Sequence, residues 1–145
     1  MSFRTVILRF CASIRLSILF AEDNPMNMKI AVEILGKAGL IVDPVTDGKQ
    51  AVEKFISSLS GTYDAILMDV QMPVMNGYEA TSAIRKSAHP QAKSIPIIAM
   101  TANAFTEDVN AALASGMNGH IAKPVEYKKL CQALREGVNI NGVEK

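Results

Sequence analysis

Carboxylates stand at the ends of two apolar segments of this sequence, where a metal-assisted or group-transfer reaction would need them. Glu22 and Asp23 follow the run 16–21, and Asp69 closes the run 64–69. Both runs are short and bounded, which is typical of strands buried on both faces in a parallel sheet. Ligands bind at the carboxyl edge of such sheets, so a carboxylate at a strand end is placed for chemistry.

Taken alone, Asp69 has a second interpretation, as the N-cap of the helix that follows it. Two more polar residues argue against this, since Thr101 ends the apolar run 95–101 and Lys123 ends the run 119–122. The carboxyl ends of parallel strands meet at one edge of a sheet, so side chains from four strand ends are expected to gather there. Capping alone does not explain that coincidence.

Such a group of acids requires a positive charge among them. Three carboxylates within about 4 Å of one another repel by roughly 4 kcal/mol per pair at an intermediate dielectric, a large fraction of a domain's stability. A hard divalent cation such as Mg²⁺ suits carboxylates together with water and an incoming phosphoryl group. Lys123 supplies a point charge for one phosphoryl oxygen, and the Thr101 hydroxyl can donate to another.

The elements that must position these residues alternate regularly along the chain. Five strand-like runs are expected at 16–21, 40–46, 64–69, 95–101 and 119–122. Five helical patterns separate and follow them, at about 25–38, 48–60, 78–87, 107–115 and 125–137. This alternation predicts an α/β fold with a doubly wound parallel sheet and right-handed crossovers. No GxGxxG follows the first strand, so a dinucleotide-binding site has no support.

Two features refine this plan. Pro44 has no N–H for a ladder hydrogen bond, which predicts that the second strand lies at an edge of the sheet. Asp47 is a suitable N-cap for the second helix, which Gly61 is expected to end. The apolar spacing of that helix predicts these inward residues: Ala51, Val52, Phe55, Ile56 and Leu59.

The composition describes an ordinary globular domain. A chain of 145 residues is near the usual size of one domain and can bury a hydrophobic core without the support of disulfides or a structural metal. The net charge of +1 gives no overall field that would indicate binding to nucleic acid or to a membrane surface. Cys11 and Cys131 are far apart, and His89 and His120 lack the spacing of metal ligands. These features favour a reducing compartment, the cytoplasm, and give no support for a zinc site.

The two ends of the chain are less regular. Arginines interrupt the apolar residues of 1–15, which disfavours a membrane span or a signal peptide. A tail, an extra strand and the remnant of a linker all remain open for this N-terminal extension. The domain itself is expected at 16–137, with a polar C-terminal tail at 138–145.

Four segments of the chain closely resemble the receiver domains of response regulators in two-component signalling. They are ILFAEDN at 18–24, ILMDVQMPVMNG at 66–77, TANA at 101–104 and GHIAKP at 119–124, in the family's order. The segment GMNGHIAKP at 116–124 looks most like the corresponding segment of receivers attached to hybrid sensor histidine kinases. The resemblance implies a flavodoxin-like five-stranded sheet in the order 2-1-3-4-5, with five helices.

The resemblance also implies a chemical role for the acidic residues. Asp69 is then the phosphoacceptor, which takes a phosphoryl group from the phosphohistidine of a histidine kinase or a histidine phosphotransfer protein. Glu22, Asp23 and Asp69 hold Mg²⁺ together with the backbone carbonyl of Gln71. Phosphorylation would shift the domain between two conformations and so relay a signal.

Other residues take the roles of phosphate contacts and switch in this resemblance. Thr101 and Lys123 contact the phosphoryl group, and the bond between Lys123 and Pro124 is expected to be cis. Thr101 and His120 form the conformational switch, although the family more often has Tyr or Phe where His120 stands. The His120 ring either packs like any other ring or biases the switch by protonation near neutral pH. Receivers often pair through their fourth and fifth helices, which the sequence leaves undecided.

Three classes of function remain open. A signalling receiver is not a conventional enzyme, although it can catalyse its own phosphorylation and dephosphorylation. A phosphatase of the aspartyl-phosphate type needs an Asp two residues after the nucleophile, where Gln71 stands instead. A receiver-like interaction module without phosphorylation would not need all the chemical residues that are present. The chain is either a stand-alone receiver or a fragment of a hybrid kinase, with no direct contact expected to nucleic acid or membrane.

Overall fold

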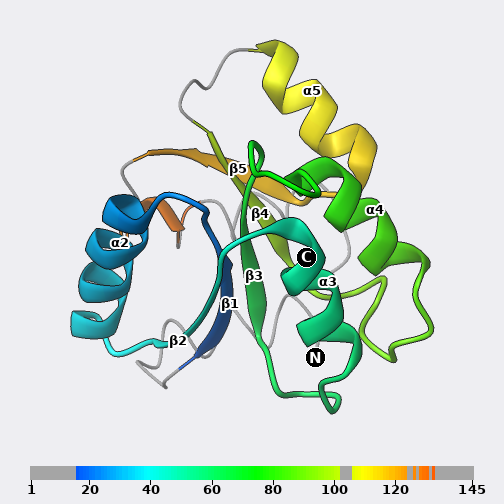
Figure 1. Ribbon diagram of the computed structural model, residues 1–145, viewed down its shortest axis with the longest axis horizontal. Helices are drawn as coiled ribbons and strands as arrows, with labels where there is room; N and C mark the ends of the chain where they lie inside the picture. Colours follow the sequence, from blue (N-terminus) through cyan, green and yellow to red (C-terminus); the bar gives the residue numbers. More distant parts are fainter. Residues whose placement is uncertain (1–15, 102–105, 124–125, 127, 131, 133–145) are drawn as a thin grey trace.

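One parallel sheet forms the centre of the computed structural model, which describes residues 16–101, 106–123, 126, 128–130 and 132 (Figure 1). Its strands are β1 (Ser17–Ala21), β2 (Ile41–Val45), β3 (Ala65–Asp69), β4 (Ile97–Thr101) and β5 (Gly119–Ala122). All neighbouring pairs are parallel, in the order β2-β1-β3-β4-β5. The predicted flavodoxin-like order is therefore confirmed.

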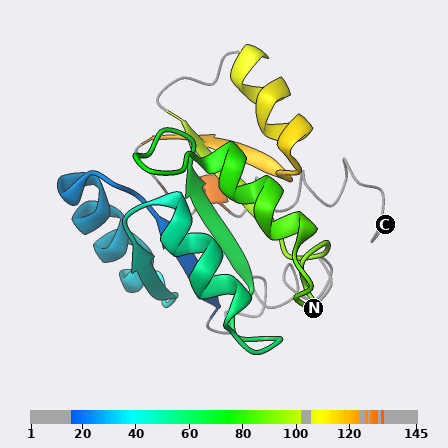
Figure 2. The same cartoon turned by 45° about the vertical axis from the view of Figure 1, so that its right-hand side comes forward.

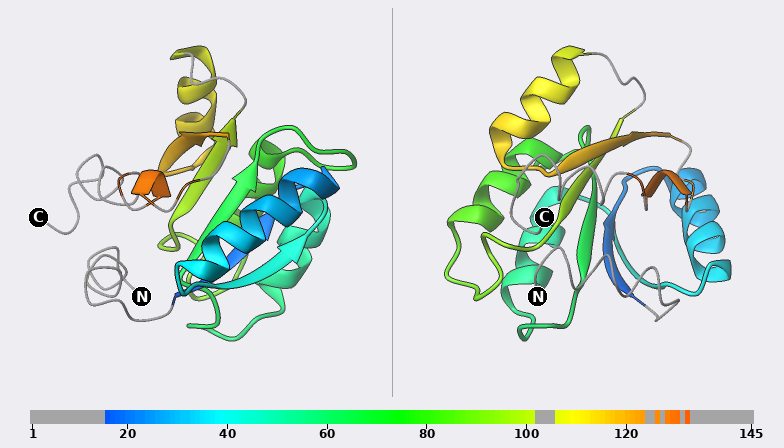
Figure 3. Two further views of the ribbon diagram at one scale, coloured as in Figure 1. Left: turned by 90° about the vertical axis from the view of Figure 1, so that its left-hand side faces the viewer. Right: turned by 180° about the vertical axis from the view of Figure 1, so that it is seen from behind.

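Helices cover both faces of this sheet. They are α2 (Pro25–Lys37), α3 (Gly48–Ile56), α4 (Gly77–Lys86) and α5 (Thr106–Ser115). Figure 2 shows α3 and α4 side by side, and the view from behind in Figure 3 places α2 on the other side of the sheet from them. Of the closing helix predicted at 125–137, the structure describes residue 126, which is not helical, and residues 128–130 and 132, which are; the other residues of that range lie outside the described part of the chain.

The alternation of side chains along β1 divides the interior into two cores. Ile18 and Phe20 pack into one core with Ala31 and Leu35 of α2. The intervening residues of β1 pack into the other core, beneath α3, α4 and α5. Every residue of β3 and β4 is buried, as expected for central strands of a parallel sheet with helices on both faces. The strand ends that carry the acidic residues are therefore held from both sides.

The edge position predicted from Pro44 is confirmed. β2 is the outermost strand and pairs only with β1 among the described strands, with Pro44 beside Phe20. Proline is tolerated there because an edge strand needs only half of its backbone groups for pairing.

Each of the first three described helices has a polar N-cap, and none of these caps is Asp69. The Asn24 side chain accepts the N–H groups of Met26 and Asn27, and Asp47 accepts that of Gln50. The cap of α4 is Asn76, which forms a reciprocal capping box with Glu79. The alternative interpretation of Asp69, as the N-cap of the helix that follows it, is therefore wrong.

The second helix is shorter than the sequence suggests. α3 ends at Ile56, and the hydroxyls of Ser57 and Ser58 donate to the carbonyl groups of Lys54 and Phe55. Serine side chains that bond to the preceding turn favour its termination. Leu59 consequently lies beyond the helix and is 82% exposed, while Ile56 is 46% exposed, so the inward placement predicted for both is wrong.

Candidate functional site

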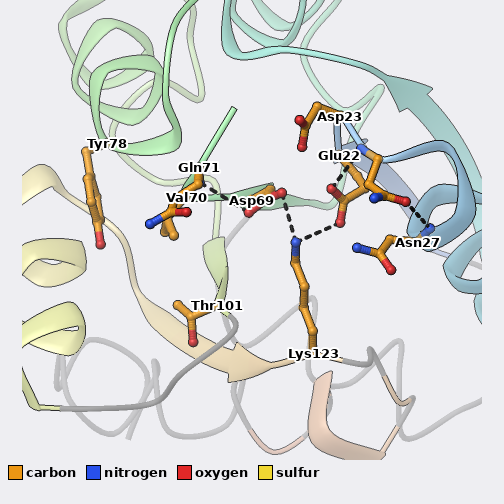
Figure 4. Close-up of a pocket in the computed structure, with 10 residues that line it drawn as sticks. Glu22, Asp23, Asn27, Asp69, Val70, Gln71, Tyr78, Thr101 and Lys123 are labelled. Carbon is orange, nitrogen blue, oxygen red and sulfur yellow. Dashed lines mark hydrogen bonds and ion pairs between the residues drawn. The ribbon is translucent and has the colours of Figure 1, made fainter. Parts of the chain in front are cut away.

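A polar pocket of about 330 Å³ opens at the carboxyl edge of the sheet (Figure 4). The β1–α2 connection, the ends of β3 and β4, and the residue after β5 all contribute to its walls. The residues that line it are Glu22, Asp23, Asn24, Asn27, Asp69, Val70, Gln71, Tyr78, Thr101 and Lys123. The residues singled out at the four strand ends therefore meet in one place.

Three acids form one wall of the pocket. Glu22, Asp23 and Asp69 each offer a carboxylate oxygen, and these oxygens lie within 4.8 Å of one another. Glu22 and Asp69 are almost completely buried, whereas Asp23 is exposed. The donor set consists of hard oxygen atoms with one open side, which fits a divalent cation that keeps part of its water shell.

Lys123 lies against this wall and pairs with two of its acids. Its Nζ atom is 2.9 Å from Asp69 Oδ2 and 3.0 Å from Glu22 Oε1. Burial lowers the pKa of Lys123, but the bonds to both carboxylates outweigh that effect and the pKa is raised overall. The ammonium group therefore stays charged. Among the described residues that line the pocket, one cation faces three carboxylates, so negative groups are in excess there.

Crowding of the acids also affects Glu22. Burial raises the pKa of Glu22, and the neighbouring Asp69 raises it further, against the lowering effect of Lys123 and of the Asn24 N–H. The Asn24 N–H donates to Glu22 Oε2 at 3.2 Å. A raised pKa means that the Glu22 carboxyl loses its proton less readily here than it would in water, so an additional positive charge in the pocket would favour its ionised form.

Contacts from three segments of the chain fix the position of Asp69. The backbone N–H of Gln71 donates to Asp69 Oδ1 at 3.2 Å, and Lys123 occupies Oδ2. Gly77 packs directly against this strand end, because a Cβ atom there would lie 2.3 Å from the carbonyl oxygen of Asp69. The close approach of α4 therefore requires glycine at its first position.

Thr101 contributes a buried hydroxyl to the pocket. Its side chain is buried, and its Oγ1 atom makes no hydrogen bond among the residues that the structure describes. A buried hydroxyl left unpaired is unfavourable by about 1–3 kcal/mol. A ligand oxygen in the pocket would supply the missing partner, which fits an incoming phosphoryl group.

The other residues of the expected site differ in their relation to this pocket. His120 is half-buried on β5, in register with Ala99 of β4, and does not line the pocket. Residues 102–104 of the TANA segment and Pro124 lie outside the described residues, as does the peptide bond expected to be cis. Gln71 lines the pocket, and the contact it makes with Asp69 is through its N–H.

Sequence reasoning overlooked Asn27 and Tyr78, both of which line the pocket. Asn27 belongs to the first turn of α2, directly after the acidic pair, and Tyr78 belongs to the first turn of α4. A first turn that follows a strand lies beside the carboxyl edge of the sheet, so polar residues in the first turn of the helix after each strand were the available signal.

Fold and pocket together define a doubly wound α/β domain with an acidic site at the carboxyl edge of its sheet. The family model of the response regulator receiver domain matches residues 18–135. This chain belongs to that family.

Relatives of the chain include long hybrid kinases. It is 41% identical over 119 residues to "Hybrid signal transduction histidine kinase I" of Dictyostelium discoideum. The aligned region covers 81% of this chain and 7% of that protein. It is 35% identical over 147 residues to "Histidine kinase 1" of Arabidopsis thaliana, covering 81% of this chain and 12% of that protein. The chain thus spans only a small part of the length of these relatives.

Solved structures of receivers share the fold. The receiver domain of sensor histidine kinase PA1611 from Pseudomonas aeruginosa PAO1, with a magnesium ion coordinated in its active site cleft, has a TM-score of 0.72 and 40% identity. That match covers 86% of this chain and 98% of the other. The chemotaxis response regulator CheY4 of Vibrio cholerae has a TM-score of 0.73 and 28% identity, and the match covers 85% of this chain and 98% of the other. No helix among the described residues has the length and apolar character needed to cross a membrane.

Proposed function

We propose that this chain accepts a phosphoryl group on Asp69 from the phosphohistidine of a histidine kinase or a histidine phosphotransfer protein. The observation that carries the proposal is the pairing of Lys123 with Asp69 and Glu22 in a pocket that also holds Asp23. A nucleophilic carboxylate, a cluster of acids and a phosphate-binding cation are the parts that such a transfer needs. The receiver then relays a signal within a phosphorelay.

The transfer forms one bond and breaks another. An oxygen of the Asp69 carboxylate attacks phosphorus, and the P–N bond of the phosphohistidine breaks as the O–P bond forms. The imidazole nitrogen keeps the electron pair of the broken bond and is free to take a proton. Lys123, already 2.9 Å from Asp69, is close enough to pair with the transferred group, and the unpaired Thr101 hydroxyl can donate to one of its oxygens.

The acids are proposed to hold Mg²⁺. Glu22, Asp23 and Asp69 would be its ligands, with the backbone carbonyl of Gln71 as the resemblance implies. When bound, the cation neutralises negative charge on the phosphoryl oxygens. The all-oxygen donor set within 4.8 Å supports this assignment.

The remaining assignments are proposals that membership of the family supports. The receiver is proposed to span 16–137, between the extension 1–15 and the tail 138–145, and to act in the cytoplasm. It would catalyse its own phosphorylation and dephosphorylation without being a conventional enzyme. Thr101 and His120 are proposed as the switch, and α5 with the closing helix as a surface for pairing with a second copy.

Intact-mass spectrometry tests the proposal. The protein is incubated with acetyl phosphate and Mg²⁺, and we expect one phosphoryl adduct that hydroxylamine removes. Asp69→Asn is expected to abolish the adduct because the nucleophile is lost. Asp64→Asn is the matched control, since Asp64 is also buried and directly precedes the same strand at its other end.

Two results would contradict the proposal. One is an adduct that persists in Asp69→Asn. The other is a folded wild-type protein that acquires no adduct, which would favour the receiver-like interaction module instead.

A further inference from the structure

The side chain of Asn27 faces the acidic pocket, and none of the roles assigned so far uses it. Asn27 lines the pocket from α2, and Figure 4 shows its carboxamide pointing toward Glu22 and Lys123. Its backbone N–H donates to Asn24 Oδ1 at 3.0 Å. The carboxamide itself makes no hydrogen bond within the part of the chain that the structure describes.

The first turn of α2 holds Asn27 in a fixed position relative to the acids. Pro25 begins the helix, and the Asn24 side chain accepts the N–H groups of both Met26 and Asn27. Asn24 in turn donates its own N–H to Glu22 Oε2 at 3.2 Å. This chain of hydrogen bonds connects the backbone of Asn27 directly to a carboxylate of the site.

Asn27 adds a neutral hydrogen-bond donor to the side of the pocket that carries Glu22 and Asp23. The carboxylates of Glu22 and Asp23 repel phosphoryl oxygens, and the side-chain oxygen of Asn24 is used as the helix cap. Lys123 and Thr101 approach from the opposite strands, β5 and β4. A neutral carboxamide can donate an N–H to an anionic oxygen without adding charge to the site.

We propose that the Asn27 carboxamide binds the incoming phosphoryl donor, donating an N–H to one of its phosphoryl oxygens while Asp69 attacks. This inference rests on the proposed function and assigns Asn27 to the loading step rather than to the metal. The exposed side chain packs against no core cluster, so its removal leaves no cavity. Its effect is therefore separable from stability.

Rates of phosphorylation test this role. Phosphoramidate, whose P–N bond resembles that of phosphohistidine, and acetyl phosphate are supplied below saturation with Mg²⁺ in excess. We expect Asn27→Ala to slow formation of the adduct about tenfold with either donor, the effect of one hydrogen bond to a charged group. Asn27→Asp has the same shape but lacks the donor and adds a negative charge, so it is expected to be slower still.

The control variant is Met26→Ala. Met26 is 66% exposed on the same turn of α2 and does not line the pocket, so its variant is expected to load at the wild-type rate. Calorimetric Mg²⁺ titration and thermal unfolding of Asn27→Ala are expected to match the wild type. That result would separate contact with the donor from a structural or metal-binding role.

Different failures have different meanings. Wild-type loading rates in both Asn27 variants would overturn the role of Asn27 and leave Asp69 phosphorylation intact. A slower Asn27→Ala whose Mg²⁺ affinity or unfolding midpoint falls in parallel would overturn it as well. A wild-type protein that forms no adduct would contradict the proposed function itself, and the role of Asn27 with it.

Discussion

Lys123 pairs with carboxylate oxygens that a bound cation would also need. Its Nζ atom lies 2.9 Å from Asp69 and 3.0 Å from Glu22, both of which are proposed metal ligands. We expect Lys123→Met to bind Mg²⁺ several-fold more tightly, because the acids lose a positive neighbour, while phosphorylation slows. Isothermal titration calorimetry measures the first effect, and Lys54→Met at the distant Asp43 pair is the control. Unchanged or weaker Mg²⁺ binding would show that Lys123 does not compete for these oxygens.

Gly77 gives a second test at the scale of one residue. A Cβ atom there would lie 2.3 Å from the Asp69 carbonyl oxygen and 3.0 Å from Met68 Cγ. We expect Gly77→Ala to lower the free energy of unfolding by about 1–3 kcal/mol and to impair phosphorylation, because the end of β3 must shift. Urea titration and intact mass measure the two effects.

Gly36→Ala is the matched control for that substitution. Nothing lies within 4 Å of a Cβ atom at Gly36, which is inside α2. Alanine there is expected to raise stability by roughly 0.5–1 kcal/mol, because it reduces the freedom of the unfolded chain. Equal effects of the two alanines would mean that the contact with Asp69 is not as close as described.

Among the elements, Arg85 connects α4 to the segments around β4 and β5. Its guanidinium donates to the carbonyl oxygens of Gly116 and Ala92 at 3.0 Å, and to Asn118 Oδ1 at 2.8 Å. Burial lowers its pKa to about 10, which still leaves it charged at neutral pH. The N-terminal end of the same helix reaches Asp69, so this anchor positions the site from a distance.

We expect Arg85→Met to lower the free energy of unfolding by about 2–4 kcal/mol, since three hydrogen bonds are lost and, among the described residues, only Asn118 Oδ1 keeps another donor, the Ile97 N–H. Lys86→Met, a change at an exposed residue of the same turn, is expected to stay within roughly 0.5 kcal/mol of wild type. Chemical denaturation measures both variants. Similar values for the two would refute the anchoring role.

The edge strand β2 carries a pH-dependent contact. Burial raises the pKa of Asp43, but hydrogen bonds from Tyr63 and Lys54 outweigh it and the pKa is lowered overall. A carboxyl with a lowered pKa in the folded state stabilises the fold above its unfolded pKa of about 3.9. That contribution disappears as the pH falls through the folded value.

Tyr63→Phe is therefore expected to lose about 1 kcal/mol of stability at pH 7. The difference from wild type should shrink as the pH falls below the unfolded pKa of about 3.9 and through the lower pKa of folded Asp43, because the carboxylate is then protonated. Urea unfolding across this range measures the difference. A difference that stays constant with pH would exclude the ionised Asp43 as the partner of the hydroxyl.

The elements also show what the sequence could predict. Strand ends were predictable because apolar runs, N-caps and Pro44 are local signals. Ile56 and Leu59 were placed wrongly because Ser57 and Ser58 end the helix before the apolar spacing does. The contacts of Arg85 have no local signal, since its acceptors are up to 33 residues away in sequence.

At the scale of the whole molecule, the site depends on the tertiary structure. Each acid sits at a strand end, and only the parallel sheet order brings Glu22 and Asp69 beside Lys123. The sequence could predict which residues at the strand ends belong to the pocket, because the ends of the strands themselves can be predicted from it. The distances among them, and the inclusion of Asn27, depend on how the helices pack on the sheet.

Because the metal site exists only in the folded chain, Mg²⁺ should stabilise the fold. At ten times its dissociation constant, a ligand of the native state adds about 1.4 kcal/mol. We expect the thermal midpoint to rise with Mg²⁺ in the wild type and to respond much less in Asp23→Asn. Sodium chloride at matched ionic strength is the control. A thermal unfolding midpoint that does not change with Mg²⁺ would contradict the proposed metal site.

The most direct test of the central claim is to identify the residue that carries the phosphoryl group. Hydroxylamine converts an aspartyl phosphate into a hydroxamate, and trypsin releases both candidate residues of this strand region, Asp64 and Asp69, in the peptide 55–85. After loading with phosphoramidate and Mg²⁺, we expect fragment spectra to place the hydroxamate on Asp69 alone. A hydroxamate on Asp64, on Asp23 or on no residue of the loaded protein would contradict the account.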